Sequence, residues 1–251
     1  MKTEISSRAN PRLKELLERK EKLIFFEGET LVGDILSREI PVNMLLFSAE
    51  MEKRLPEISA AVVEHWLVSR PVLEKISDLK TPAEIIAVLE MPVWEIDFKR
   101  QKIVFGFDTV QDPANLGTVF RCAAAFGISA LAMAGACVRA NHPKVVRAAQ
   151  TALLDIPFQV FPSLDGLIAK AQNQGAHIYV TGSHAAEKPL AVENMEFPCL
   201  VLFGNEGQGL EPQLLKRFPL IRLDQKERID SLNVAVSACI LMHEVKRIHG
   251  L

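Results

Sequence analysis

A glycine-rich segment, Phe203-Gly204-Asn205-Glu206-Gly207-Gln208-Gly209-Leu210, has the composition of a ligand-binding loop. It follows the apolar run 199–203, which is typical of a buried parallel strand. Glycines let main-chain amides and carbonyls approach a ligand closely, while Glu206 opposes phosphate and favours a cationic or hydroxyl-bearing group. The segment matches neither the P-loop nor the dinucleotide G-x-G-x-x-G pattern, which argues against a nucleotide phosphate site. A purely structural glycine turn is the alternative.

A second segment places an arginine on a well-specified helix. Asp112 is a natural N-cap, and Pro113 suits the first helical position. A glycine inside a helix costs about 1 kcal/mol relative to alanine, yet Gly117 stands on the same face as Arg121, four residues later. We therefore expect a close approach to that face. Asn115 lies at the helix mouth, where its amide could meet a ligand or hold a loop. A salt bridge at the surface or at an interface is the alternative role for Arg121.

A third segment starts the last helix. Ser231 is a plausible N-cap, and the residues that follow are apolar on nearly every face, so the helix should be buried or lie at a subunit interface. Asn233 is the polar exception at its start. It needs hydrogen-bond partners, which a substrate or a neighbouring loop could supply. Simple capping of the helix is the alternative.

The elements that position these segments alternate regularly after residue 98. We expect strands at 103–107, 130–133, 158–161, 178–181, 200–203 and 220–223, and helices at 115–126, 143–154, 164–172, 212–218 and from 231 onward. This alternation predicts an α/β fold with a mainly parallel sheet and helices on both faces. Ligands bind beyond the carboxyl ends of such strands, where all three segments begin.

The first part of the chain has a different pattern, and we place a domain boundary between residues 97 and 98. A helix after Asn10-Pro11 and strands at 23–26, 42–47 and 60–68 predict a small α/β domain. Residues 1–22 contain seven Lys/Arg against four Glu. This basic excess indicates either a solvated helix face or an electrostatic contact with nucleic acid.

Length and composition indicate a folded cytoplasmic protein. The chain has 251 residues, of which 49% are hydrophobic, which is ample for a core. No apolar run is long enough to span a membrane, and the first residues lack the apolar core of a signal peptide. Cys122, Cys137, Cys199 and Cys239 have no metal-ligand spacing, so we expect reduced core thiols and no metal site.

Three motifs, in this order, resemble the signatures of the SpoU/TrmH family (SPOUT superfamily) of RNA ribose 2'-O-methyltransferases. They are Asn115-x-Gly117-x-x-x-Arg121, Phe203-Gly204-Asn205-Glu206-Gly207-x-Gly209-Leu210 and Ser231-Leu232-Asn233-Val234-x-Val236. The resemblance covers residues 100–249. The first 95 residues resemble the family's N-terminal substrate-binding domain through Asn10-Pro11, Phe25-Phe26-Glu27-Gly28-Glu29, and Ser77-Asp78 with Thr81-Pro82.

This resemblance implies a C-terminal trefoil knot, a homodimer with the site at its interface, and tRNA or rRNA as the partner. It also implies S-adenosylmethionine as cofactor, whose sulfonium and amine suit an acid-containing loop, and it implies no metal. In the family, main-chain groups of the second and third motifs hold the adenine and apolar side chains sandwich it. Those positions map to Leu202, Gly204, Ile221, Leu223 and Leu232.

The implied chemistry is in-line transfer of a methyl group from the sulfonium to a ribose 2'-hydroxyl. The family places an arginine at this step, matching Arg121. A guanidinium is effectively always protonated, so we expect Arg121 to grip the adjacent phosphate and stabilise the developing oxyanion rather than act as a base. Asn115, Glu206, Ser231 and Asn233 would hold Arg121 and the ribose.

The chain departs from the family pattern in three places. Arg222 stands where proline is usual, the loop 224–230 is longer and more charged, and residues 147–151 replace a stretch that commonly has serine and glycine. A catalytically silent, knotted RNA-binding protein is the alternative function, against which the intact signature residues speak. A nucleotide-dependent dehydrogenase or kinase would need a phosphate loop that the sequence lacks.

Overall fold

The computed structural model describes residues 2–55, 61–182, 189–205, 207–223 and 231–250. The chain forms two compact units, Met1–Pro92 with Asn141–Thr151, and Val93–Ala140 with Ala152–Leu251. The division after Pro92 comes earlier in the chain than residue 97. Grouping of Asn141–Thr151 with the first unit was not indicated by the sequence.

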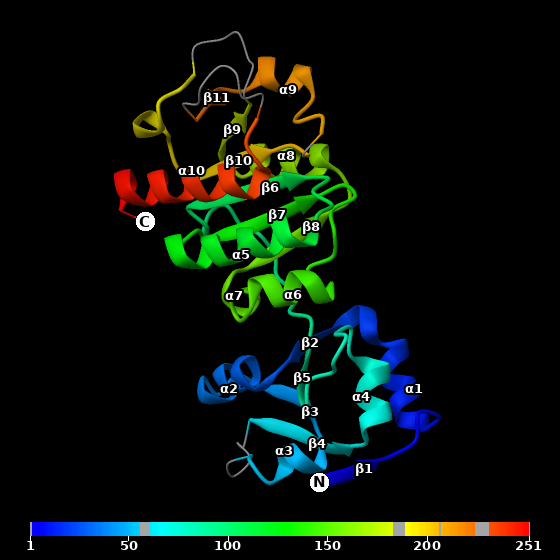
Figure 1. Cartoon of the computed structure of the whole chain (residues 1–251). Helices are drawn as coiled ribbons and strands as arrows, with labels where there is room; N and C mark the ends of the chain where they lie inside the picture. The colour runs from blue at the N-terminus through cyan, green and yellow to red at the C-terminus, as the bar shows by residue number, and fades with distance from the viewer. Residues whose placement is uncertain (1, 56–60, 183–188, 206, 224–230, 251) are drawn as a thin grey trace. The chain divides into compact units, whose positions relative to one another are not determined.

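The first unit is a mixed sheet with short helices (Figure 1). Its strands, in the order β1-β4-β3-β5-β2, are β1 (Lys2–Ile5), β4 (Val62–Val68), β3 (Val42–Phe47), β5 (Ile85–Glu90) and β2 (Leu23–Glu27). β4 runs parallel to both its neighbours, whereas β5 runs antiparallel to both of its own. The helices are α1 (Pro11–Glu18), α2 (Glu29–Ser37), α3 (Ala49–Glu52) and α4 (Arg70–Ile76), with a 3-10 turn at Lys20–Lys22. The expected small α/β domain is confirmed. Two of its strands were not predicted: β5, and the edge strand β1, of which only Ile5 is buried.

Most of the basic side chains near the N-terminus form ion pairs within this unit. Six pairs join α1 and its flanking segments to carboxylates: Lys2–Glu52, Arg8–Glu74, Arg12–Glu64, Lys14–Glu18, Arg19–Glu90 and Lys20–Asp78. All are exposed, so each contributes about 1 kcal/mol or less to stability. Their charges are nevertheless balanced locally, which favours the solvated-face reading of the basic excess.

The second unit is built on a sheet in which every strand runs parallel to its neighbours. Its order is β11-β9-β10-β6-β7-β8, comprising β11 (Leu220–Ile221), β9 (His177–Thr181), β10 (Cys199–Phe203), β6 (Ile103–Asp108), β7 (Ala130–Ala134) and β8 (Phe158–Phe161). The predicted α/β class with a parallel C-terminal sheet is therefore confirmed. The trefoil knot stays a prediction.

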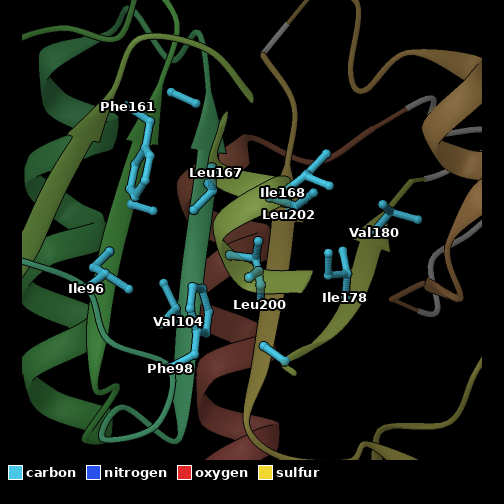
Figure 2. Packing of buried hydrophobic residues seen from close by; sticks show 14 of the residues in the cluster. Ile96, Phe98, Val104, Phe161, Leu167, Ile168, Ile178, Val180, Leu200 and Leu202 are labelled. Carbon is cyan, nitrogen blue, oxygen red and sulfur yellow. The ribbon is translucent and has the colours of Figure 1, made fainter. Parts of the chain in front are cut away.

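Helices cover both faces of this sheet. Helices α5 (Pro113–Phe126) and α10 (Val234–His249) pack side by side on one face (Figure 1). The other face contacts α8 (Leu164–Asn173), and α9 (Pro212–Arg217) packs against β9. Figure 2 shows the core beneath α8, where Leu167 and Ile168 pack against Val104, Leu200 and Leu202 of the central strands. The remaining short elements are α7 (Ala152–Asp155) and the 3-10 turn Val192–Asn194.

The pairing of β6 with β10 occupies the centre of the sheet. Their register sets Phe107 beside Phe203 and Gly106 beside Leu202. The ring of Phe203 stacks on Phe107 at 5.2 Å and on Phe105 at 5.5 Å. A Cβ atom at Gly106 would lie only 2.7 Å from Cδ2 of Leu202, so glycine lets the α8 side of the core close tightly over β6.

The helix expected at 143–154 is two helices, a difference from the prediction. Helix α6 (Pro143–Ala149), in the first unit, ends at Gln150, and α7 starts at Ala152 in the second. Gln150 has φ 55° and ψ −142°, which ends the helical path. Apolar periodicity continues across this break, so spacing alone could not reveal it.

The cysteine prediction is wrong for one pair. Cys122 of α5 and Cys239 of α10 form a disulfide, because packing of the two helices brings their Cα atoms to 5.5 Å. Cys137 and Cys199 are free thiols. Burial raises the pKa of Cys199 to about 12 and also raises the pKa of Cys137, so neither is a ready thiolate at neutral pH. In the described part of the chain, no helix has the length and apolarity needed to span a membrane.

Candidate active site

A cavity of about 320 Å³ opens beside the carboxyl ends of β9, β10 and β11 and the start of α10. Its walls come from four segments of the second unit: Thr181 and Gly182; Phe203–Asn205 with Gly207–Gly209; Ile221–Leu223; and Ser231, Leu232, Val234, Ser237 and Leu241. Segments 203–209 and 231–234 belong to the second and third motifs. The cavity therefore lies where parallel α/β sheets bind ligands.

Four of the five predicted cofactor positions lie in the wall of this cavity. Gly204, Ile221, Leu223 and Leu232 line it, whereas Leu202 is fully buried beneath it. The carbonyl oxygen of Leu202 accepts a hydrogen bond of 2.9 Å from Oγ1 of Thr181. Its main-chain acceptor is thus already engaged by a residue that itself lines the cavity.

The glycine loop folds back on itself, and this explains Gly204. A Cβ atom there would lie 2.0 Å from the carbonyl carbon of Gly209 and 2.3 Å from the amide nitrogen of Leu210. Asn205 holds the turn, because its Oδ1 accepts from the amides of Gly207 and Gln208 at 3.0 and 2.6 Å. Glycine is therefore required at position 204 for the loop to close on itself, whether or not a ligand also comes close to it. Glu206 lies outside the described residues.

Asn233 joins the third motif to the first. It is the N-cap of α10, and its Oδ1 accepts from the amides of Ala235 and Val236. Its Nδ2 donates to Oδ1 of Asn115 at 2.9 Å. The prediction of Ser231 as N-cap is wrong, because the helix begins only at Val234; Ser231 instead lines the cavity. Asn233 therefore does both things considered for it: it caps α10, and it contacts a neighbouring segment.

Helix α5 presents its two predicted site residues differently. Asp112 caps the helix through the amide of Ala114, as expected. Asn115 is 8% exposed and faces Asn233, while Arg121, six residues further along the helix, is exposed. The described wall of the cavity does not include Arg121. Of the predicted catalytic residues, Ser231 lines the cavity; Asn115 and Asn233 bond to each other outside its described wall, and Arg121 lies at the surface of α5.

Sequence reasoning missed four wall residues. Thr181 ends β9 and Gly182 follows it, while Ser237 and Leu241 lie on α10. Ser237 and Leu241 are three and seven residues after Val234, the spacing of one helix face. That spacing could have identified Ser237 and Leu241 once the helix start was known. No sequence pattern identifies Thr181, which reaches the cavity only because of how β9 pairs in the sheet.

Comparison with known proteins decides the family. The model of the SpoU rRNA Methylase family matches residues 102–243. The chain belongs to this family. Residues 9–87 match the MRM3-like substrate binding domain, so the resemblance drawn from the motifs and from the first 95 residues is confirmed.

Two relatives and one solved structure are similar to this SpoU chain over most of their length. It is 29% identical to the 23S rRNA (guanosine(2553)-2'-O)-methyltransferase RlmP of Bacillus subtilis, over 90% of each chain. It is 31% identical to the human mitochondrial rRNA methyltransferase 3, over 91% of this chain and 68% of that one. The crystal structure of an AdoMet-bound rRNA methyltransferase from Sinorhizobium meliloti superposes with a TM-score of 0.80 at 25% identity, covering 100% and 99% of the two chains.

The cavity of this SpoU chain fits S-adenosylmethionine. Phe203, Ile221, Leu223, Leu232 and Leu241 offer apolar walls for an adenine ring, and the main chain of the glycine loop offers polar groups. Among the described residues, no cluster of three or more His, Cys, Asp or Glu side chains is placed to hold a metal ion. The chemistry of the wall suits a nucleoside whose base packs on apolar side chains and whose other end is polar.

Gly204→Ala should abolish binding of S-adenosylmethionine by distorting the loop. The added methyl group would overlap main-chain atoms of Gly209 and Leu210, which cannot move aside like a side chain. Gly207→Ala is the matched control, because its Cβ would meet nothing closer than Oδ1 of Asn205 at 3.7 Å. Calorimetry should show binding by the control alone, with the circular dichroism of both variants unchanged. Equal affinity in the two variants would contradict this account.

Asn233→Asp should keep the N-cap of α10 and remove the hydrogen bond from residue 233 to Asn115. Aspartate caps helices as well as asparagine does, but its carboxylate cannot donate to Oδ1 of Asn115. We expect the free energy of unfolding to fall by about 1 kcal/mol, and Asn233→Ala, which loses the cap as well, to cost about 2 kcal/mol. Urea denaturation measures both. A double-mutant cycle with Asn115→Ala should give a coupling energy of about 1 kcal/mol, and additivity would show that the bond contributes nothing.

Proposed function

We propose that this chain transfers the methyl group of S-adenosylmethionine to a ribose 2'-hydroxyl of tRNA or rRNA. The observation that carries the proposal is that the second and third motifs line one cavity, while the hydrogen bond between Asn233 and Asn115 ties the first motif to the third. Relatives named as rRNA 2'-O-methyltransferases support it and favour ribosomal RNA. The MRM3-like domain at residues 9–87 supports RNA binding by the first unit. A cytoplasmic location stays a prediction.

The chain's own residues have to position a poor nucleophile. When bound, S-adenosylmethionine supplies an electrophilic methyl group on its sulfonium. The 2'-hydroxyl must be oriented and its developing negative charge stabilised. Arg121 would contact the adjacent phosphate and that oxygen, since its guanidinium keeps its proton and can bind in a bidentate manner. Asn115, Ser231 and Asn233 would orient the ribose and Arg121, with Glu206 as a further predicted member.

A homodimer would complete the site, because Arg121 is exposed on α5 and does not belong to the described cavity wall. Helix α10, which packs against α5, leaves Val236 and Ile240 exposed at 46% and 41%. Two large apolar side chains one turn apart on a helix surface are suited to pack against a second copy. We therefore place the site at an interface formed by α5 and α10.

Arg121→Ala should slow methyl transfer by about two to three orders of magnitude, the usual cost of removing one donor to an oxyanion. Binding of S-adenosylmethionine should stay nearly intact. Arg121→Lys should recover little, because an ammonium cannot reproduce the planar bidentate contact. Single-turnover transfer of labelled methyl to cellular RNA measures the step, with calorimetry for cofactor binding.

The outcomes of that experiment are distinct. Transfer close to the wild-type rate in the alanine variant would make Arg121 a structural residue, and loss of cofactor binding alone would place it in the cofactor site. A wild-type protein that binds RNA but transfers no methyl group would favour the alternative, a catalytically silent RNA-binding protein.

Sedimentation velocity at micromolar concentration should show a species of twice the 27.9 kDa chain mass. Ile240→Asp should convert it to monomer, because a charge would be desolvated in the interface. Val160→Asp is the matched control, since Val160 is also exposed, at 60%, but lies on the edge strand β8. A wild-type protein found only as monomer would reject the dimer.

A further inference from the structure

Arg222 is the charged residue in the described wall of the cavity. The other described wall residues are apolar, glycine, hydroxyl or amide side chains. Sequence comparison alone gave Arg222 no role, and marked it as a departure from the proline that is usual at this position. A cation at this place changes which ligand groups the cavity favours.

The backbone that leads to Arg222 is held by the sheet. Arg222 follows β11, whose last residue, Ile221, is paired with Thr181 of β9 and is 1% exposed. Thr181 in turn donates to the carbonyl oxygen of Leu202 in the next strand. The sheet therefore holds the main chain up to the residue before Arg222, while the side chain of Arg222 is exposed.

The ligand proposed for this cavity has one anionic group. The methionine end of S-adenosylmethionine carries a carboxylate and an ammonium, while the adenosine and the sulfonium carry no negative charge. A carboxylate is the natural partner of a guanidinium, which can donate two parallel hydrogen bonds to it. The apolar wall residues, by contrast, suit the adenine ring.

We propose that Arg222 binds the carboxylate of the methionine end of S-adenosylmethionine. This inference rests on the proposed function and assigns a ligand group to a residue of the same site. Phosphate of the RNA substrate is a weaker candidate for Arg222, because the residue belongs to the wall of the small cavity and shares it with the glycine loop. The arginine thus increases affinity for the cofactor and selects for its intact amino-acid end.

The test compares two ligands, S-adenosylmethionine and its decarboxylated form, which keeps the sulfonium and the ammonium. In Arg222→Ala, calorimetry should show S-adenosylmethionine binding weakened about fivefold to tenfold, as for one partly exposed charge-assisted contact. Binding of the decarboxylated ligand should change less than about twofold, since it has no group for Arg222 to bind. Arg222→Lys should retain part of the affinity for S-adenosylmethionine. Lys216→Ala, which removes an exposed cation of α9 outside the cavity wall, is the control for net charge.

Each other outcome overturns the inference in a recognisable way. Equal weakening of both ligands would make Arg222 a structural residue of the wall. Unchanged cofactor affinity with weaker RNA binding in a filter assay would make it a phosphate contact. Failure of the wild-type protein to bind either ligand would refute the proposed function itself, which is a different result from a failure confined to the variant.

Discussion

The pairing of β6 with β10 is the constraint on which the site depends. These strands are far apart in the sequence, yet their parallel register ends them together, Phe107 beside Phe203. The segment that leads to α5 and the glycine loop therefore leave the sheet at one edge. Close packing keeps this register, because the three stacked phenylalanine rings lie on one face and Gly106 admits Leu202 on the other. A shift by one residue would exchange these faces.

The two helices that follow this edge of the sheet bring residues of the first and third motifs together. α5 begins at Pro113 and α10 at Val234, and the amide of Asn233 spans the gap between their first turns. This one side chain therefore accepts hydrogen bonds from two main-chain amides and donates one to the side chain of Asn115. Few residue types can do both, since aspartate has no donor and alanine neither function. The disulfide between Cys122 and Cys239 joins the same helices further along.

The sequence was sufficient for the architecture of the second unit, because buried parallel strands and their helices have distinct apolar periods. It was also sufficient for Asp112, Asn115 and the glycine loop, whose residue types are tied to local geometry. It was insufficient where local patterns are ambiguous. Ser231 and Asn233 are both good caps, and only the path of the chain into α10 selects Asn233.

Other features depend on contacts between distant segments, and no local pattern contains them. Thr181 reaches the cavity because β9 pairs with β10 and β11. The disulfide exists because α5 and α10 pack together. The break at Gln150 requires a positive φ, which glutamine rarely adopts and which no sequence pattern predicts there. Gly204 was identified from the sequence, but the reason for glycine there is that Gly209 and Leu210 of the same loop pack against its Cα.

The paired cations of the first unit affect how the protein meets a polyanion. Around α1, positive charges alternate in space with the carboxylates that bind them, and such dipolar arrays lose their field within about one Debye length, roughly 8 Å in physiological salt. This face therefore contributes little to long-range attraction of RNA. RNA recognition at this face depends on short-range shape complementarity and on replacement of a carboxylate partner by a phosphate. We therefore expect slower association with RNA and higher specificity.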